Sequence, residues 1–464
     1  MKYSIPRVVV AGLKGGSGKT TLSLGLLSLL NRSGRKIVPF KKGPDYIDPG
    51  WLARASGRPC YNLDAFLFPG EVVAASFVSH SMGHDGALVE GNRGLFDGMD
   101  ERGTFSTARL AKSISAPVLL AVDCTKATTT IAAIIRGITA FDRDLVIGGV
   151  VLNQLAGDRH EQVIRRAVEM YTDARVVGAI RRQGRLIMGE RHLGLIPHQE
   201  AVDVDTVIKD ISDLIEKSVD VSAVVDMMDS APSLDAEQNI YGAKAGIPED
   251  EKVRVGVIKD AAFQFYYPEN LNLLELEGAD IVEINALMDG LLPDIDILYI
   301  GGGFPETQAD ILSGNTSLLD SIKHNADNGL PVYAECGGLM YLGESIEFGG
   351  KVYGMSGVLP IKFIVEEKPV AHGYTIVEVR KDNPYFEAGL ELRGHEFHYS
   401  RITELGNRED LKLVFKMKRG GGIRNGYDGV VYKNVFATYT HLHALGSPEW
   451  VKAMINVAIS YKNQ

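Results

Sequence analysis

A glycine-rich run near the N-terminus restricts the fold more than any other part of the sequence. Residues 12–20 read Gly-Leu-Lys-Gly-Gly-Ser-Gly-Lys-Thr and follow an apolar run at residues 8–11. Residues 20–31 have leucines at helical spacing, and Gly34 follows as a helix stop. Small residues between a strand and a helix let successive backbone N–H groups surround phosphate oxygens. We therefore expect a nucleotide-binding loop here; the alternative is a glycine-rich turn without a ligand.

The side chains around this run match what a bound triphosphate requires. Lys19 can neutralise the β- and γ-phosphates, and the Thr20 hydroxyl is a ligand for Mg²⁺. The first position of the strict G-x-x-x-x-G-K-[ST] pattern is Leu13, so the fit is to the variant K-G-G-x-G-K-T, which adds Lys14. Asn153 ends a later strand-like run, where its amide can meet adenine or cap a helix. The expected ATP-binding residues are Lys14, Gly15, Gly16, Ser17, Gly18, Lys19, Thr20, Thr21 and Asn153.

The variant loop resembles that of the partitioning and nitrogenase-iron-protein class of P-loop proteins. In that class the extra lysine can reach a nucleotide across a dimer interface, so Lys14 would imply a homodimer. Lys14 can equally be a solvated charge, and the sequence leaves these two alternatives open.

Strand-like and helical patterns alternate through the chain. From residue 8 to about residue 214, each buried-strand run is followed by a segment of helical period. This alternation is typical of a doubly wound, mostly parallel sheet covered by helices. Residues 216–252 are acidic and contain small residues and prolines, which predicts an interdomain connector with one short helix near residues 221–228. We therefore expect an α/β fold, with a P-loop domain over residues 1–215 and a second α/β domain over residues 253–464.

Charged side chains follow the strands that would neighbour the nucleotide loop. Asp45 and Asp48 lie in a turn-rich stretch after the second strand, and Glu90 ends the third. Ligands of a doubly wound sheet bind at this edge, and a carboxylate there can hold Mg²⁺ or a water. In a loop, aspartates also act simply as turn formers. Lys41 or Lys42 can neutralise an acidic substrate, and the expected metal ligands are Thr20, Asp48 and Glu90.

The second α/β block contains a candidate nucleophile. Cys336 follows a strand-like run and precedes Gly337 and Gly338, which permit a sharp strand-to-helix turn and present an N–H group to an oxyanion. A single cysteine is more often a buried small residue, but this context favours a catalytic thiol. A helix N-terminus at this place would lower the pKa of the Cys336 thiol.

A catalytic thiol also requires a base and an oxyanion site. His441 follows a strand-like run near the C-terminus and can take the thiol proton, with His395 and His398 as rival bases or substrate contacts. The glycines at residues 301–303 follow another strand and can offer N–H groups to the same oxyanion. The expected oxyanion site consists of Gly302, Gly303 and Gly337.

Composition excludes several kinds of partner. The 59 acidic residues outnumber the 49 basic ones, which disfavours nucleic acid and anionic membranes as partners. The three cysteines, Cys60, Cys124 and Cys336, are far apart, which disfavours a disulfide framework or a zinc site and fits a reducing cytoplasm. The N-terminus lacks a signal-peptide pattern, and no apolar run approaches the roughly 20 residues of a spanning helix. We expect a soluble cytoplasmic protein.

Taken together, these stretches resemble the cobyrinic acid a,c-diamide synthase family of corrinoid biosynthesis over nearly the whole chain. The first domain is similar to dethiobiotin synthetase and the second to class I glutamine amidotransferases. The resemblance is carried by the phosphate loop and by residues 40–49, 90–98, 190–195, 260–270, 301–306, 333–342 and 439–443.

The resemblance implies a glutamine-dependent amido-ligase. Glutamine would be hydrolysed at Cys336, and ATP with Mg²⁺ would activate a tetrapyrrole carboxylate at a synthetase site that includes Asp45, Asp48, Glu90 and Asp97. The implied reaction is amidation of the a- and c-acetate groups of cobyrinic or hydrogenobyrinic acid. Two alternatives remain open: the same amidation on a sirohydrochlorin-type ring, as nickel-sirohydrochlorin or sirohaem, and, more remotely, a partitioning-type ATPase switch.

Two positions depart from the pattern of class I amidotransferases. Those enzymes usually have a glutamate two residues after the histidine, whereas this chain has His443 there, so the group that orients His441 is missing or different. Ala334 stands where many relatives have glycine. The first departure would leave glutamine hydrolysis weak.

Overall fold

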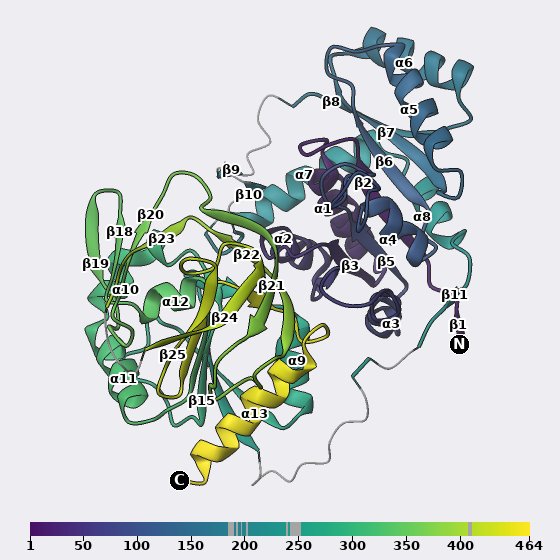
Figure 1. The fold of residues 1–464 in the computed structure, drawn as a ribbon. Helices are drawn as coiled ribbons and strands as arrows, with labels where there is room; N and C mark the ends of the chain where they lie inside the picture. Colours follow the sequence, from purple (N-terminus) through teal and green to yellow (C-terminus); the bar gives the residue numbers. More distant parts are fainter. Residues whose placement is uncertain are drawn as a thin grey trace. The chain divides into compact units, whose positions relative to one another are not determined.

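The chain forms two compact units, Met1–Ile240 and Tyr241–Gln464 (Figure 1). The computed structural model describes residues 1–183, 197–200, 203–237, 240–241, 252–406 and 411–464, together with the backbone of the short strands β9 (Glu190–Arg191) and β10 (Gly194–Leu195). Within these residues, no helix combines the length and the apolar character that crossing a bilayer requires.

The first unit is built on a seven-stranded sheet in the order β4-β3-β5-β2-β6-β7-β8, with every neighbouring pair parallel. The chain starts at the central strand β2, winds to one edge, returns to β5 and then winds to the other edge. This confirms the predicted doubly wound sheet. The strands are β2 (Arg7–Gly12), β3 (Ile37–Lys42), β4 (Tyr61–Leu63), β5 (Gly86–Glu90), β6 (Val118–Asp123), β7 (Ile147–Leu155) and β8 (Val176–Arg181).

Eight helices of the first unit are described. Four of them, α1, α2, α7 and α8, share one apolar core with the sheet, built from leucines of α1, Trp51 of α2 and isoleucines of α7. Because β2, β3 and β5 are buried along their whole length, their carboxyl ends form a rigid edge for the loops that follow. The helices are α1 (Lys19–Arg32), α2 (Ile47–Ser56), α3 (Gly70–Ser81), α4 (Thr107–Ser113), α5 (Thr130–Phe141), α6 (Asp158–Tyr171), α7 (Val204–Ser218) and α8 (Val221–Asp229).

The first unit extends beyond the predicted boundary at residue 215. The short helix expected near residues 221–228 is α8, but Val224, Met227 and Met228 on it are buried in the core of the first unit. Strand β11 (Leu234–Asp235) then pairs with β1 (Lys2–Tyr3). The acidic residues that suggested a connector over residues 216–252 are thus partly the polar face of an amphipathic helix, and the first unit ends at Ile240.

The second unit contains a ten-stranded mixed sheet in the order β14-β12-β15-β17-β26-β25-β24-β21-β22-β27. The strands from β14 to β26 are parallel, and those from β26 to β27 pair in the antiparallel sense. These strands are β12 (Val253–Ile258), β14 (Ala279–Ile284), β15 (Ile297–Ile300), β17 (Val332–Glu335), β21 (Ala371–Val379), β22 (Glu391–His398), β24 (Lys412–Arg419), β25 (Tyr427–Tyr432), β26 (Val435–Thr438) and β27 (His441–Leu442).

Helices and two small sheets complete the second unit. Side chains of α10 (Ala309–Gly314), α11 (Thr316–Asp327) and α12 (Gly337–Leu342) belong to one apolar core. Those of α9 (Pro268–Leu276) and α13 (Pro448–Lys462) belong to another. The small sheets consist of β13 (Phe263–Phe265) with β16 (Gly302–Gly303), and of β18 (Ser345–Phe348), β19 (Lys351–Gly354), β20 (Ile361–Val365) and β23 (Ser400–Leu405).

Candidate active sites

The predicted phosphate loop connects β2 to α1. Gly16 and Gly18 have φ angles of 73° and 92°, a left-handed backbone that favours glycine. The amide nitrogen of Asn153, on β7, donates to the carbonyl of Ser17 at 3.0 Å, and a Cβ at Gly18 would overlap this amide. Asn153 therefore braces the loop, a role that we did not expect from the sequence. Its contact with adenine remains a prediction.

The two lysines of the loop have different surroundings. Lys19 Nζ donates to the carbonyls of Lys14 and Arg93 at 3.2 and 2.9 Å, and burial together with the charge of Lys41 lowers the pKa of Lys19. The Lys14 side chain is 68% exposed and lies 3.3 Å from the carboxylate of Asp123, which ends β6. Lys14 thus has an ion-pair partner within its own chain. Its reach across a dimer interface remains a prediction.

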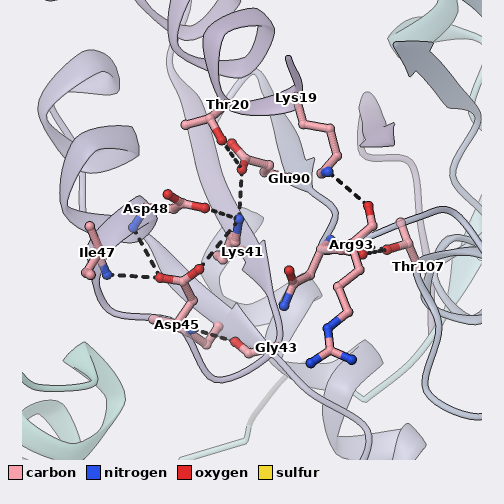
Figure 2. A network of polar contacts seen from close by, with 12 residues as sticks. Lys19, Thr20, Lys41, Gly43, Asp45, Ile47, Asp48, Glu90, Arg93 and Thr107 are labelled. Atoms are coloured by element: carbon pink, nitrogen blue, oxygen red, sulfur yellow. Dashed lines mark hydrogen bonds and ion pairs between the residues drawn. The ribbon is translucent and has the colours of Figure 1, made fainter. Parts of the chain in front are cut away.

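A buried cluster of charges lies beside the loop, at the carboxyl ends of β3 and β5 (Figure 2). Lys41, only 2% exposed, points its ammonium group at three carboxylates: it donates to Glu90 Oε1 at 2.7 Å and to Asp48, and lies 3.7 Å from Asp45. The Thr20 hydroxyl donates to the same Glu90 oxygen at 2.9 Å. The fold therefore brings together five residues that the sequence placed at the synthetase and metal sites.

This cluster shifts the ionisation of its members. Burial and the charge of Asp48 raise the pKa of Asp45 to about 7. Burial also raises the pKa of Glu90. Burial would raise the pKa of Asp48 too, but the charge and the hydrogen bond of Lys41 outweigh it, so the pKa of Asp48 is lowered. Burial would lower the pKa of Lys41, but the surrounding carboxylates raise it well above its ordinary value. Lys41 is therefore charged, and three carboxylates share its one ammonium group.

The raised pKa of Asp45 predicts a pH dependence of stability in the absence of Mg²⁺ and nucleotide. The folded carboxyl binds its proton more tightly than an unfolded one, so its contribution to the free energy of unfolding falls as pH rises from about 4 to about 7, and the full penalty is present above pH 7. Asp45→Asn should raise the melting temperature clearly more at pH 8 than at pH 5, measured by thermal unfolding. An equal shift at both pH values would contradict this expectation.

Asp97 does not belong to the Lys41 cluster. Its Oδ2 accepts a hydrogen bond from the Gly94 backbone at 2.9 Å, and its side chain lines a cavity of about 640 Å³. The cavity also contains four cations and two aromatic rings, Phe96 and Phe141, whose centroids are 4.7 Å apart. The cations are Arg93, Arg102, Arg109 and Lys112. We did not expect this cavity from the sequence, because its charges lie on an irregular loop and on α4.

The second unit contains the predicted nucleophile turn. Cys336, between β17 and α12, has a φ angle of 48°, and its backbone N–H donates to Thr438 of β26 at 2.8 Å. A Cβ at Gly337 would lie 3.0 Å from the Gly303 nitrogen, and Gly338 donates to the Gly301 carbonyl at 3.1 Å. The glycine loop after β15 therefore lies directly against the cysteine turn, as the predicted oxyanion site requires.

The imidazole of His441 lies against the same glycine loop. A Cβ at Gly302 would be 2.5 Å from His441 Cε1 and 3.3 Å from Nε2, so this edge of the ring faces the loop. The other nitrogen, Nδ1, lies 3.3 Å from Oε2 of Glu335, and the ring of His395 stacks on His441 with centroids 4.9 Å apart. The three predicted segments, around Gly302, Cys336 and His441, thus meet in one site.

The rival base His398 has a different place. Its Nδ1 lies 2.8 Å from the Ser400 carbonyl, and its ring stacks on Tyr439 at 3.6 Å. These contacts fix the ring beside the strand that carries the carbonyl of Phe397, which is 3.6 Å from the thiol of Cys336. His398 therefore lies next in the chain to a residue whose carbonyl contacts the thiol.

The expected lowering of the Cys336 pKa is wrong. Burial of the thiol, which is 3% exposed, and the charge of Glu306 raise its pKa well above the ordinary value, and the Gly337 N–H group offsets this only in part. The sequence indicated that Cys336 precedes a helix, but it did not indicate that the fold would exclude water from the thiol. The resting thiol is therefore protonated and requires a base when it reacts.

Comparisons with known proteins match both units. Residues 8–196 match the family model described as the CobQ/CobB/MinD/ParA nucleotide binding domain, and residues 254–449 match the CobB/CobQ-like glutamine amidotransferase domain. The protein of Magnetococcus marinus named cobyrinate a,c-diamide synthase is 39% identical to this chain, and the match covers 97% of this chain and 96% of that protein. The protein of the same name from Archaeoglobus fulgidus is also 39% identical, and the match covers 100% of this chain and 99% of that protein. The chain belongs to the cobyrinate a,c-diamide synthase family. A protein of Dehalococcoides mccartyi with the same name is also 39% identical to this chain, and the match covers 98% of both proteins.

Membership of this synthase family confirms the resemblance seen in the sequence, including the nucleotide-binding and glutamine amidotransferase domains and the assignment as a ligase. The motif at residues 190–195 contributed to that resemblance, but apart from the backbone of β9 and β10 it lies outside the described residues.

The structure also shows what surrounds His443, which stands where class I amidotransferases have a glutamate. Its Nε2 lies 3.7 Å from Oε1 of Glu269, and its ring packs on Tyr267 with centroids 4.4 Å apart. Asn270 from the same segment binds the backbone on both sides of His443, at Leu442 and Ala444. The motif at residues 260–270 therefore supports the turn that follows His441.

Proposed function

We propose that this protein amidates the a- and c-acetate carboxylates of cobyrinic or hydrogenobyrinic acid, using ATP and the ammonia released from glutamine. The observation that carries the proposal is the presence, in one chain, of the Lys19–Thr20–Glu90 site and the Cys336–His441 site, in a protein whose relatives match over almost their whole length. A sirohydrochlorin-type substrate is not favoured by the names of these relatives. A partitioning-type switch would leave the amidotransferase unit without a role.

Glutamine hydrolysis would proceed at the buried thiol. His441 takes the proton of Cys336 as the sulfur attacks the side-chain amide carbon, and the N–H groups near Gly337 and in the 301–303 loop stabilise the oxyanion. The C–N bond then breaks, and His441 returns the proton to the leaving ammonia. Water hydrolyses the remaining thioester to give glutamate and free thiol.

The synthetase reaction would use the edge beside the phosphate loop. The loop and Lys19 bind the triphosphate, and a substrate carboxylate attacks the γ-phosphorus, which releases ADP and leaves an acyl phosphate. Ammonia attacks the acyl carbon and displaces phosphate, giving the amide. Because ammonium is not a nucleophile, we expect ammonia to pass between the sites without release to solvent.

The described residues fit Mg²⁺ at the synthetase site. Thr20, Asp48 and Glu90 would hold it, and Glu90 Oε2 is buried without a hydrogen-bond partner among the described atoms. No group of three or more acidic, histidine or cysteine side chains in the described part of the chain is arranged to hold a metal alone, which suits an ion that binds through one or two carboxylates and the phosphates. Bound Mg²⁺ would neutralise charge on the triphosphate.

The cavity beside Arg93 fits the peripheral carboxylates of a tetrapyrrole. Its wall carries three guanidinium groups that can bind carboxylates and a pair of aromatic rings that a flat ring system can contact. Four acidic residues, Asp97, Asp100, Glu101 and Asp142, also line it, and Asp142 is paired with Lys112. Arg109→Ala should raise the KM for the tetrapyrrole by roughly tenfold and leave the KM for ATP unchanged, as expected for one lost charge-assisted hydrogen bond. Steady-state kinetics would check this, with the exposed Arg136→Ala on α5 as the control. Equal changes in both KM values would contradict a substrate role.

The deciding experiment is amidation of a panel of tetrapyrrole acids with a mass readout. The panel comprises cobyrinic acid, hydrogenobyrinic acid, sirohydrochlorin, its nickel complex and sirohaem. We expect two successive mass changes, each from exchange of OH for NH₂, with cobyrinic or hydrogenobyrinic acid, together with ATP-dependent glutamate release. Amidation of only the sirohydrochlorin-type rings would reject the proposed substrate, and absence of glutamate release would reject the reaction class.

A further inference from the structure

Glu335, the residue directly before the thiol, contacts the imidazole of the proposed base. Its Oε2 lies 3.3 Å from Nδ1 of His441, and both side chains are only 1% exposed. We propose that Glu335 is the positioning residue that orients His441, in place of the glutamate that class I amidotransferases have two residues after this histidine. This inference rests on the proposed hydrolysis of glutamine at Cys336.

The carboxylate of Glu335 is itself held in place. Its Oε1 accepts hydrogen bonds from the Tyr333 hydroxyl at 3.3 Å and from the Leu442 backbone at 3.2 Å. Because Leu442 follows His441 directly, one carboxylate fixes both the ring and the backbone of β27. Glu335 also adjoins Cys336 in the chain, so the base is tied to the turn that carries the nucleophile.

A second histidine, His395, stacks on the ring of His441. Burial together with the charge of His441 lowers the pKa of His395 well below the ordinary value, so His395 is neutral. Its Nδ1 lies 3.3 Å from the Tyr267 hydroxyl. Two other buried glutamates have different contacts: Glu269 lies beside His443, and Glu396 accepts hydrogen bonds from the backbone of Gly421 and Gly422. Glu335 is therefore the carboxylate whose geometry suits His441.

This geometry selects the useful tautomer of His441. If Nδ1–H donates to Glu335, the acceptor nitrogen of the ring is Nε2, which lies on the edge that faces Gly302 and can take the thiol proton. The carboxylate also stabilises the imidazolium that forms when the proton is taken. A buried, protonated thiol such as Cys336 depends on a base of this kind.

The test compares Glu335→Gln with Glu269→Gln in the full-length protein. The Glu335→Gln substitution keeps the size of the side chain but presents an amide that no longer selects the tautomer, so the kcat of glutamine hydrolysis should fall by about 100-fold. The KM for glutamine should stay within about twofold, and ammonium-driven amidation should be unchanged, because the synthetase site is intact. Glu269→Gln makes the same chemical change at an equally buried site beside a histidine and should keep kcat within about threefold.

Two results would overturn the role of Glu335 as the positioning residue. A wild-type kcat in Glu335→Gln, or an equal loss in Glu269→Gln, overturns the inference. If Glu335→Gln fails to fold, as judged by loss of ammonium-driven amidation, Glu335→Asp decides: its shorter side chain should lower kcat by about tenfold with KM retained, and a wild-type kcat overturns the inference. If the unaltered protein releases no glutamate from glutamine, it is the proposed function that fails.

Discussion

Replacing Cys336 by alanine is expected to lower glutamine-driven amidation by three orders of magnitude or more, to about the background rate. The substitution removes the sulfur that forms the thioester. The two residues that follow Cys336 on this turn, Gly337 and Gly338, have no hydroxyl or thiol that could replace it. Alanine tolerates the backbone at this position as well as cysteine does, because both carry a Cβ at a φ of 48°. The measurement is amide formation with glutamine as the nitrogen source.

Ammonium salt at mildly alkaline pH should restore amidation in the same variant. Free ammonia then reaches the acyl phosphate without Cys336, so ATP consumption and amide formation should proceed at near the wild-type ammonium-driven rate. Thermal unfolding of the variant provides the control for folding. If both nitrogen sources fail in a protein that unfolds normally, the two sites do not divide the reaction as proposed.

The synthetase cluster could be predicted because sheet topology alone places its members together. Lys41 and Glu90 lie at the carboxyl ends of the neighbouring parallel strands β3 and β5. Asp45 and Asp48 come directly after β3, and the carboxyl ends of parallel strands share one edge of the sheet. The strand-to-helix order around Lys19 indicated the nucleotide loop in the same way. What sequence could not give is the ion-pair geometry, with Lys41 at the centre of three carboxylates.

The contact between Glu335 and His441 could not be predicted, because it depends on strand register. In the sheet, Glu335 is the register partner of Thr438, and His441 follows Thr438 by three residues. This pairing brings the carboxylate to the imidazole, although 106 positions separate them in sequence. The one signal in the sequence was the glutamate directly before the thiol, which stands out only when the missing glutamate after His441 is sought elsewhere.

The second large effect is expected from Lys41→Met, which keeps an unbranched side chain, shorter by one atom, and removes its charge. Three carboxylates would lose their shared, buried cation, and an uncompensated buried charge costs about 3–5 kcal/mol of unfolding free energy. ATP-dependent amidation should be lost, whereas glutamine hydrolysis at Cys336 should persist in the protein that remains folded. Thermal unfolding and glutamate release measure these two results.

Lys42→Met is the matched control, because Lys42 is the neighbouring buried lysine. Burial lowers the pKa of Lys42, so the folded protein disfavours the charge that this substitution removes. We expect this variant to be as stable as the unaltered protein or more stable. Mg²⁺ should recover part of the stability that Lys41→Met loses, since a divalent cation bound by Asp48 and Glu90 supplies the charge that the ammonium gave. Equal melting temperatures for the two variants, or no stabilisation by millimolar Mg²⁺, would show that the Lys41 carboxylates do not form a cation site.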